Sequence, residues 1–387
     1  MQNHVPCLSR FFEVCGFAHN LHFYNITHTS SVQCKKFGRV RYFGARDERF
    51  GLMAHRKRIK LNNGDYTEYV LMLAAPVIVS WYYYGANALR LMLAGAVSAV
   101  LFELIALTAM KRDRRSMLDL HAVFTGLAVA MMLPATANTA LVVAGTAFAI
   151  FVVKIPFGSA LKTPFVPAAA AMAFLTLCFP GEVFLFPSLE TATAEFEPGV
   201  SLAAMLKAGS SYHMNTLRVL SVISGNVAGP MGAGCAVVLL GSCAFFAFIR
   251  PQKLCNVAGF VAACAVLALL FPRGPFGRMT SLMTELCAGT LLFSAVFFAT
   301  DPATSPKKPA QRFIYGAFAG TVCMLLRYFG AFEDASCFGI LLANAFWPII
   351  NSALRRAGVY RLAKRMAQKR RGRRKEKNAA AVQGGEL

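Results

Sequence analysis

Long apolar stretches follow one another along most of this chain, and they limit its fold more than any other feature. From Tyr66 onward about ten stretches are long enough, at about 17 to 20 residues, to cross a hydrocarbon core. They run near 66–85, 88–110, 118–134, 138–156, 164–180, 231–249, 253–271, 281–300, 313–329 and 335–353. Of the 387 residues, 56% are hydrophobic and only 15% charged, against about 25% charged in soluble domains. The sequence predicts an all-α membrane protein with about ten transmembrane helices.

Basic residues gather in alternate connections between these stretches. HRKRIK precedes the first stretch, KRDRR follows the second, RPQK follows the sixth and KKPAQR follows the eighth. The intervening connections, such as PATAN and FEDA, are poor in Lys and Arg. Since cytoplasmic loops retain Lys and Arg, this alternation predicts an even number of spans with both termini cytoplasmic. The net charge of +22 is therefore interpreted as a topology signal and not as a nucleic-acid surface.

Composition divides the chain into three parts. Residues 1–65 form an expected basic, disordered extension, and Met53, which opens MAHRKRIKLNN, is the expected true start. Residues 66–353 form the transmembrane domain, and residues 354–387 form a basic cytoplasmic tail suited to anionic lipids. Ten spans divide into five and five, and an odd number per half would invert the second half relative to the first. The two halves are not visibly similar, so the inverted repeat rests on geometry alone.

The eleven cysteines show no CxxC pair and no spacing typical of zinc or iron–sulfur sites. Most lie inside apolar stretches, where a thiol packs as a small hydrophobe. No metal site is expected.

Polar side chains inside apolar stretches are costly and are candidates for function. Glu103 lies in the second stretch and Glu285 in the eighth, so each is either a residue of an ion path or one half of a pair between helices. Asp119 and His121 stand at the start of the third stretch, where an interfacial role competes with ligand binding.

Three Gly-, Pro- and Asn-rich segments interrupt the apolar pattern, at 157–168, 224–234 and 301–309. Such breaks leave backbone groups without helical partners, so protein or a bound polar ligand must satisfy them. Glycines and helix N-termini would suit a phosphate-bearing cofactor. The alternative is that these segments are ordinary loops and that the glycines allow helices to pack closely. GAFAG at 316–320, for example, has the GxxxG spacing of a close helix contact.

Five blocks, in order, resemble a known family. They are LHAVFTGLAVAMMLP, FGSALKTPFVPAA, SGNVAGPMGAG, FATDPATSPKKPAQRFIYGAFAG and LRYFGAFEDASCFGILLANAFWPIIN. They are similar to blocks of the RnfD protein of the Rnf electron-transport complex, which is related to the NqrB protein of the sodium-pumping NADH:quinone reductase. The resemblance covers most of residues 66–353.

The resemblance implies a ten-helix inverted-repeat bundle in a bacterial inner membrane, acting within a complex and not catalytic alone. Electrons would pass through bound flavin (FMN) between ferredoxin and NAD, with coupled Na⁺ or H⁺ movement. The partners would be the other Rnf-type membrane and iron–sulfur subunits. The implied cofactor-binding positions are Asp119, Thr125, Gly126, Gly225, Asn226, Gly229, Asp301, Thr304 and Ser305. Of these, Asp301, Thr304 and Ser305 would cap a broken helix end on the cytoplasmic side.

The chain departs from the family where FMN is attached. In the family a Thr of an SGAT motif holds the FMN phosphate, whereas the corresponding region here reads EFEPGVSLAAMLKAG. Ser201 stands where the acceptor hydroxyl belongs, and Thr163, Val166 and Ala233 replace two Asn and one Glu of the family blocks. Thr191 and Thr193 are nearby but less well placed than Ser201, and these departures indicate a divergent member of the family that could lack FMN. An electron-transfer subunit with bound flavin is the first hypothesis, with Ser201 as the candidate attachment residue. A flavin-free scaffold subunit and a solute transporter or channel on the same fold are the alternatives.

Overall fold

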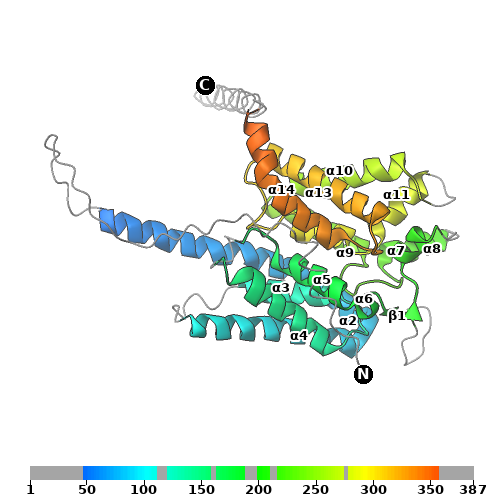
Figure 1. Ribbon diagram of the computed structural model, residues 1–387, viewed down its shortest axis with the longest axis horizontal. Coiled ribbons are helices and arrows are strands. Elements are labelled where there is room, and N and C mark those ends of the chain that lie inside the picture. Colours follow the sequence, from blue (N-terminus) through cyan, green and yellow to red (C-terminus); the bar gives the residue numbers. More distant parts are fainter. Residues whose placement is uncertain are drawn as a thin grey trace, which may run out of the picture. The chain divides into compact units, whose positions relative to one another are not determined.

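The computed structural model describes residues 47–110, 120–157, 163–187, 198–209, 216–273 and 278–356, and these residues are mostly helical. Side-chain surroundings are described from Tyr66 onward. The helices and π-helices (η) in chain order (Figure 1) are α2 (Asp47–Ala109), α3 (Leu120–Met132), α4 (Thr139–Ala147), η2 (Phe148–Lys154), α5 (Pro167–Cys178), α6 (Pro180–Val183), α7 (Leu202–Lys207), α8 (Thr216–Ser224), α9 (Ala236–Ile249), α10 (Leu254–Leu270), α11 (Arg278–Cys287), α12 (Leu291–Phe293), η3 (Ser294–Phe298), α13 (Pro309–Phe329) and α14 (Ser336–Arg356).

Each of the ten expected apolar stretches coincides with a helix or with a run of consecutive helices. The first two lie in α2, which is interrupted at Gly85, where φ is 61° and ψ is −138°. The fourth corresponds to α4 with η2, and the eighth to α11, α12 and η3. Helix starts follow local chemistry, since Pro occupies the first turn of α5 and α13, and the Asn138 side chain accepts from Ala140 N at the start of α4.

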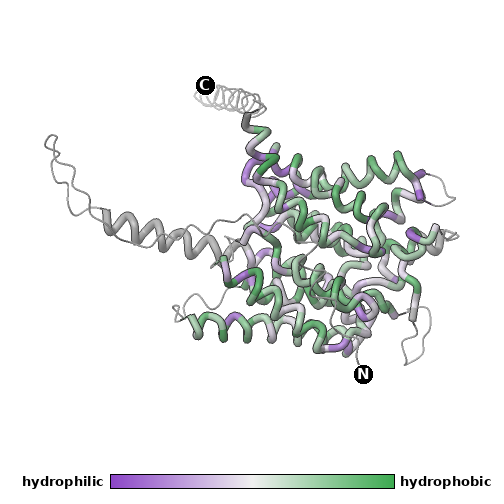
Figure 2. Tube along the Cα trace, viewed as in Figure 1, coloured by the Kyte–Doolittle hydropathy of each residue, from purple (hydrophilic) through white to green (hydrophobic). Residues whose placement is uncertain are grey.

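The number of full-length spans differs from the expected ten. Among the described residues, Tyr66–Ala109 and Ser336–Leu354 are long and apolar enough to cross a membrane. Arg278–Cys287 with Leu291–Phe298 makes a third if the bent pair is one span. Five further apolar helices are shorter, at 10–17 residues. Figure 2 shows hydrophobic residues along most of the helices, as expected for a membrane protein. The described structure therefore supports the helical, membrane-type class, and the ten spans and the inverted repeat stay predictions.

The helices between residues 65 and 356 make two neighbouring groups. In the first, α3, α4, η2 and α5 contact one another; in the second, α10 contacts α13 most extensively, and α13 contacts α14 (Figure 1). Contacts between α5 and α14 join the two groups. A short antiparallel pair, β1 (Phe186–Pro187) with β2 (Pro198–Gly199), leads into α7.

Glycines allow the closest helix crossings. A Cβ on Gly316 or Gly320 of α13 would overlap the Asn256 or Phe260 carbonyl oxygen of α10, which confirms the close GxxxG contact predicted for GAFAG. Gly95 of α2 and Gly126 of α3 face each other in the same way.

The eighth apolar stretch is broken in the middle. α11 ends at Cys287, and α12 with η3 continues after Gly289 (φ 63°), with a bend of 67° between the two halves. Because a break exposes the carbonyl end of one half and the N–H end of the other, this point needs polar partners at membrane depth.

Candidate functional site

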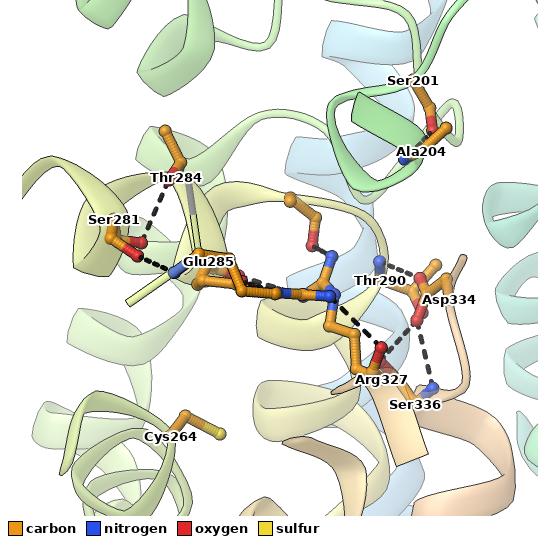
Figure 3. Close-up of polar contacts among 12 residues, drawn as sticks. Ser201, Ala204, Cys264, Ser281, Thr284, Glu285, Thr290, Arg327, Asp334 and Ser336 are labelled. Atoms are coloured by element: carbon orange, nitrogen blue, oxygen red, sulfur yellow. Dashed lines mark hydrogen bonds and ion pairs between the residues drawn. The ribbon is translucent and has the colours of Figure 1, made fainter. Parts of the chain in front are cut away.

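Ser201 lies at the start of α7 and is held from two directions. Its Oγ accepts a hydrogen bond from Ala204 N over 3.0 Å, which makes it the N-cap, and donates to Glu333 Oε2 over 2.5 Å (Figure 3 shows the cap). Glu333 belongs to the connection between α13 and α14. Lys207, at the other end of α7, donates to Ala331 O in the same connection. The α13–α14 connection therefore fixes both ends of the short helix that carries Ser201.

Ser201 lines a small inner cavity, and a second, outer hollow shares Phe184 and Glu333 with that cavity. The inner one is a cavity of about 30 Å³, lined by Met132, Met172, Thr176, Val183, Phe184, Phe186, Ser201, Ala203, Ala228, Gly229, Pro230, Gly289, Thr290, Glu333, Asp334, Cys337 and Phe338. The outer one is an open groove of about 520 Å³, lined by Phe184, Ala204, Lys207, Ala208, Ala331, Phe332 and Glu333. The groove has the volume of a small-molecule site, and the cavity has room for about one water molecule.

Aromatic rings line this region. Phe332 stacks on Phe338 with ring centroids 5.9 Å apart and planes 8° apart, and Phe184 lies against Phe332 at 6.1 Å and 26°. Phe184 and Phe332 border the groove, so one wall presents aromatic surface while Lys207 supplies a cation on the same groove. This arrangement suits a flat ring system that carries a phosphate.

The break between α11 and α12 is capped from the α13–α14 region (Figure 3). Arg327, near the end of α13, donates from Nη1 to Glu285 O over 3.0 Å and from Nη2 to Ala288 O over 2.8 Å. Asp334 accepts from Thr290 N over 2.5 Å and from Ser336 N over 3.1 Å. A cation therefore meets the carbonyl end of one half-helix and a carboxylate meets the N–H end of the other, as the helix dipoles favour.

Glu285 is ion-paired within this network. Its two carboxylate oxygens accept from Arg273 Nε over 2.6 Å and from Arg273 Nη2 over 2.9 Å, and Arg327 Nε lies 3.7 Å away. The side chains of Glu285 and Arg327 are 0% and 1% exposed. Of the two roles expected for Glu285, the described geometry shows the pairing between helices, and a role on an ion path stays a prediction.

Glu103 also has a partner. The Lys154 ammonium donates to Glu103 Oε1, and both side chains are buried. Lys154 is the last residue of η2, so the pair joins α2 to the end of a π-helix. Glu103 therefore links two elements, and its proposed place on an ion path stays untested.

Asp301 organises the segment at 301–309. Its Oδ1 accepts from the Tyr66 hydroxyl over 3.2 Å and its Oδ2 from Ala303 N over 3.1 Å. Ser305 N donates to Asp301 O over 2.9 Å. Asp301 therefore closes a turn, whereas α13 begins at Pro309 with Lys308 as its N-cap and no side-chain cap, so the predicted capping of a helix end by Asp301, Thr304 and Ser305 stays a prediction. Burial raises the pKa of Asp301 from 3.8 to about 6, against the lowering effect of the hydrogen bonds from Ala303 and Tyr66.

Tyrosines from α2 surround this segment. Tyr69 donates to Thr300 Oγ1 over 2.9 Å, and the His121 ring packs edge-on against Tyr66 with centroids 4.5 Å apart. Within the described part of the chain neither ring nitrogen of the buried His121 has a hydrogen-bond partner. Thr304 and Ser305 belong to the same turn, in which Arg312 Nε donates a hydrogen bond to the Pro306 carbonyl oxygen over 2.7 Å.

The segment at 224–234 pairs with the end of α3. Met231 N donates to Leu133 O over 3.2 Å, Gly232 N donates to Met131 O over 2.8 Å, and Ser80 Oγ donates to Met231 O over 2.9 Å. Gly225 has φ of 87° and no room for a Cβ against Cys235, so its glycine is required by the backbone. Other protein groups thus form hydrogen bonds with several backbone groups of this non-helical segment.

The nine residues predicted by resemblance do not form one site. Gly229 lines the cavity beside Ser201, and Gly225 and Asn226 lie in the same segment as Gly229. Asp301, Thr304 and Ser305 precede α13, and Glu333, the partner of Ser201, follows it. The turn at 301–305 and the Ser201 region therefore lie at opposite ends of a helix about 30 Å long. Thr125 donates to His121 O over 2.8 Å and Gly126 packs on Gly95, which are helix-internal and packing roles. Asp119 lies outside the described residues.

Sequence reasoning missed the residues that complete the Ser201 region, which are Phe184, Arg327, Phe332, Glu333 and Asp334. FEDAS at 332–336 did carry a signal, because Asp two residues before a Ser at a helix start is a capping pattern. Nothing local linked Glu333 to Ser201, which is 132 residues earlier in the chain.

The similar proteins found by comparison are D subunits of ion-translocating oxidoreductase complexes. The D subunit of a Na⁺-translocating ferredoxin:NAD⁺ oxidoreductase complex from Acetobacterium woodii is 30% identical over 287 residues, covering 73% of this chain and 85% of that protein. The D subunits of ion-translocating oxidoreductase complexes from Salmonella arizonae and Escherichia coli O9:H4 are each 29% identical, over 73% of this chain and 90% of theirs. The family model for NQR2, RnfD and RnfE matches residues 55–359. This chain belongs to the NQR2, RnfD, RnfE family.

Proposed function

We propose that this chain is the RnfD-type membrane component of an ion-translocating oxidoreductase complex and that electrons pass through a flavin attached to Ser201. The names of its relatives support the first part. The observation that carries the second is the Ser201 hydroxyl, which donates to Glu333, a residue that lines a groove together with two phenylalanines and a lysine.

Ser201 and the residues that line the neighbouring groove fit FMN in kind. Ser201 would hold the phosphate as an ester, Lys207 would face its charge, and the Phe184 and Phe332 rings would contact the flat ring system. The flavin, when bound, supplies the uptake and release of electrons. Glu333 holds the Ser201 hydroxyl in a fixed rotamer, and the N-cap bond from Ala204 fixes the backbone beneath it. Ser offers the same oxygen nucleophile as the Thr of the family motif.

The proposed complex lies in a bacterial inner membrane, with other membrane and iron–sulfur subunits as partners and with Na⁺ or H⁺ as the coupled ion. Both termini would be cytoplasmic. The segment at 301–309 would then face the cytoplasmic partners, while Ser201 and Glu333 would lie on the outer side.

A repeated tripeptide supports the inverted five-plus-five arrangement of ten spans. Pro134-Ala135-Thr136 follows α3, and Pro302-Ala303-Thr304 follows η3. Each ends the third apolar stretch of its half and precedes the fourth. Matching breaks in the two halves are typical of inverted-repeat transporters, which place their functional sites at such points.

The experiment is in-gel fluorescence of the affinity-purified complex under ultraviolet light. The wild-type chain is expected to fluoresce, Ser201→Ala to lose the signal and Ser201→Thr to keep it, because Thr restores an acceptor hydroxyl. Ser352→Ala, an exposed serine that bonds only Ile349 O within its own helix, is the matched control and should fluoresce normally.

Two outcomes separate the alternatives. A colourless wild-type chain that still co-purifies with the other subunits identifies a flavin-free scaffold. A colourless chain that purifies alone and takes up a solute in proteoliposomes identifies a transporter and contradicts the electron-transfer proposal.

A further inference from the structure

Three cations lie close together where α10 and α13 begin. Arg250 Nε donates to Glu68 Oε1 over 3.1 Å, and Lys253 Nζ lies 3.7 Å from Glu68 Oε2. Lys253 also lies over the Tyr69 ring, 4.3 Å from its centroid, and Arg312 is within electrostatic range of the same ring. Burial lowers the pKa of Arg312, and so does the charge of the neighbouring Arg250. The Glu68 carboxylate thus serves two of three neighbouring cations.

The third cation, Arg312, is oriented but not neutralised. Its Nε donates to the Pro306 carbonyl oxygen over 2.7 Å, which fixes the guanidinium against the turn before α13. Among the described residues no carboxylate forms an ion pair with Arg312. The other carboxylate nearby, Asp301, accepts from Tyr66 and from Ala303 N. The two terminal amino groups of Arg312 therefore offer an anion the planar, two-donor geometry that suits a phosphate.

Two helix starts add positive potential at the same place. Gly316 and Gly320 of α13 pack on Asn256 and Phe260 of α10 in the same order, so the two helices run parallel and begin at the same end (Figure 1). No side chain in the described part of the chain caps the start of either helix. Because the N–H end of a helix favours negative charge, these two parallel helices reinforce the attraction of the cations for an anion.

Exposed apolar side chains stand next to both arginines. At the end of α9, Phe248 and Ile249 are 88% and 47% exposed and directly precede Arg250. Phe313, also 47% exposed, directly follows Arg312. Each arginine therefore lies at the boundary between a polar connection and an apolar helix surface. A free anion would contact the cations alone, whereas a lipid with an anionic head would contact both the cations and the apolar surface.

We propose that Arg250 and Arg312 bind the phosphate group of one anionic phospholipid, whose acyl chains lie along the exposed apolar residues beside them. The terminal amino groups of Arg312 donate to the phosphate oxygens, and Arg250 supplies a second guanidinium. Lys253 offsets the Glu68 carboxylate, which would otherwise repel the ligand. The lipid joins the end of α9 to the start of α13, and the inference requires neither a flavin nor a partner subunit.

The test is native mass spectrometry of the detergent-purified full chain titrated with phosphatidylglycerol. The wild type is expected to bind one phosphatidylglycerol molecule tightly and phosphatidylcholine, whose head has no net charge, about tenfold more weakly. Arg312→Gln should weaken the first phosphatidylglycerol about tenfold or more, because it removes two charge-assisted hydrogen bonds. Arg312→Lys should lie between the two, since it keeps the charge but loses the planar geometry.

Arg278→Gln is the matched control, because it removes the same charge from an exposed residue at the start of α11, which follows the far end of α10. All variants keep the basic tail, so lipid bound there does not distinguish them. The control should bind phosphatidylglycerol as the wild type does. Equal affinities of Arg312→Gln and Arg278→Gln overturn the proposal. If Arg312→Gln fails to fold, Arg250→Gln is compared with the control in the same way.

Two further arms test other sources of negative charge. Inorganic phosphate at the concentration of the lipid should not displace phosphatidylglycerol, because it makes no contact with the apolar surface. Displacement would identify a site for free anions and overturn the lipid assignment. A chain that binds a polyglutamate peptide but no phosphatidylglycerol would identify a docking surface for an acidic protein, which also overturns it.

Discussion

The buried carboxylate of Asp301 makes stability depend on pH. Its pKa in the folded protein is about 6 against an ordinary value of 3.8, so between these values the folded state binds more protons than the unfolded state. The contribution of Asp301 to stability is therefore largest at low pH and falls as pH rises from about 4 to 6, by at most about 1.4 kcal/mol per pH unit.

Asp301→Asn is expected to remove this slope, because Asn keeps an acceptor for Ala303 N and does not ionise. The measurement is the difference in Tm between variant and wild type from pH 4 to 7, which should shift in favour of the variant as pH rises. A difference that is constant with pH contradicts the prediction.

The buried Arg327 side chain lies within ion-pair distance of the Glu285 carboxylate and donates hydrogen bonds to two backbone carbonyls at the break. Arg327→Met should destabilise the protein by about 3–5 kcal/mol, because it leaves buried acceptors unsatisfied. Arg273→Met should cost less, since its side chain is 19% exposed and it caps no half-helix. Denaturation of the two variants in detergent checks the order, and a greater loss for Arg273→Met contradicts it.

Residue roles could be predicted only where they are local. The turn at Asp301 follows from Asp, Ser and Pro in one short segment, because the partners of a turn residue are a few residues away. The partners of Ser201, Glu103 and Glu285 come from distant segments, so the sequence identified the buried polar groups without identifying what neutralises them.

At the scale of elements, the α10–α13 crossing depends on glycine. Gly320→Ala should destabilise the protein by about 1–3 kcal/mol, since the new methyl group overlaps the Phe260 carbonyl and the helices must separate. Gly241→Ala in α9 is the control, because a Cβ there meets nothing within 4 Å. Tm of the two variants checks the pair, and equal losses would contradict a packing role for Gly320.

The positions of the long helices along the chain were predictable from the sequence. Their bends and their π-helical segments were not. Apolar length located the long helices but not α6, α7 and α8, and Gly and Pro located the breaks, because both signals act over one or two turns. The 67° bend has tertiary partners, Asp334 and Arg327, which follow it in the sequence. For the same reason short helices could not be distinguished from full spans.

At the scale of the whole molecule, the distribution of basic residues predicts which side of the membrane each loop occupies. Alkaline phosphatase fused after Lys207 should be active, because that site is expected outside, and the same enzyme fused after Lys308 should be inactive. Phosphatase assays in whole cells measure both, and activity of the Lys308 fusion would overturn the proposed topology.

The broken span also constrains how the chain is made. Its two inner ends are capped by Arg327 and Asp334, which the ribosome adds only after the whole broken span has been synthesised. During synthesis, the segment at 278–298 must therefore remain unsatisfied beside the translocation machinery until the last two helices arrive. A nascent chain stopped before Asp334 leaves these backbone groups without partners in the bilayer, and quality-control proteases should remove it.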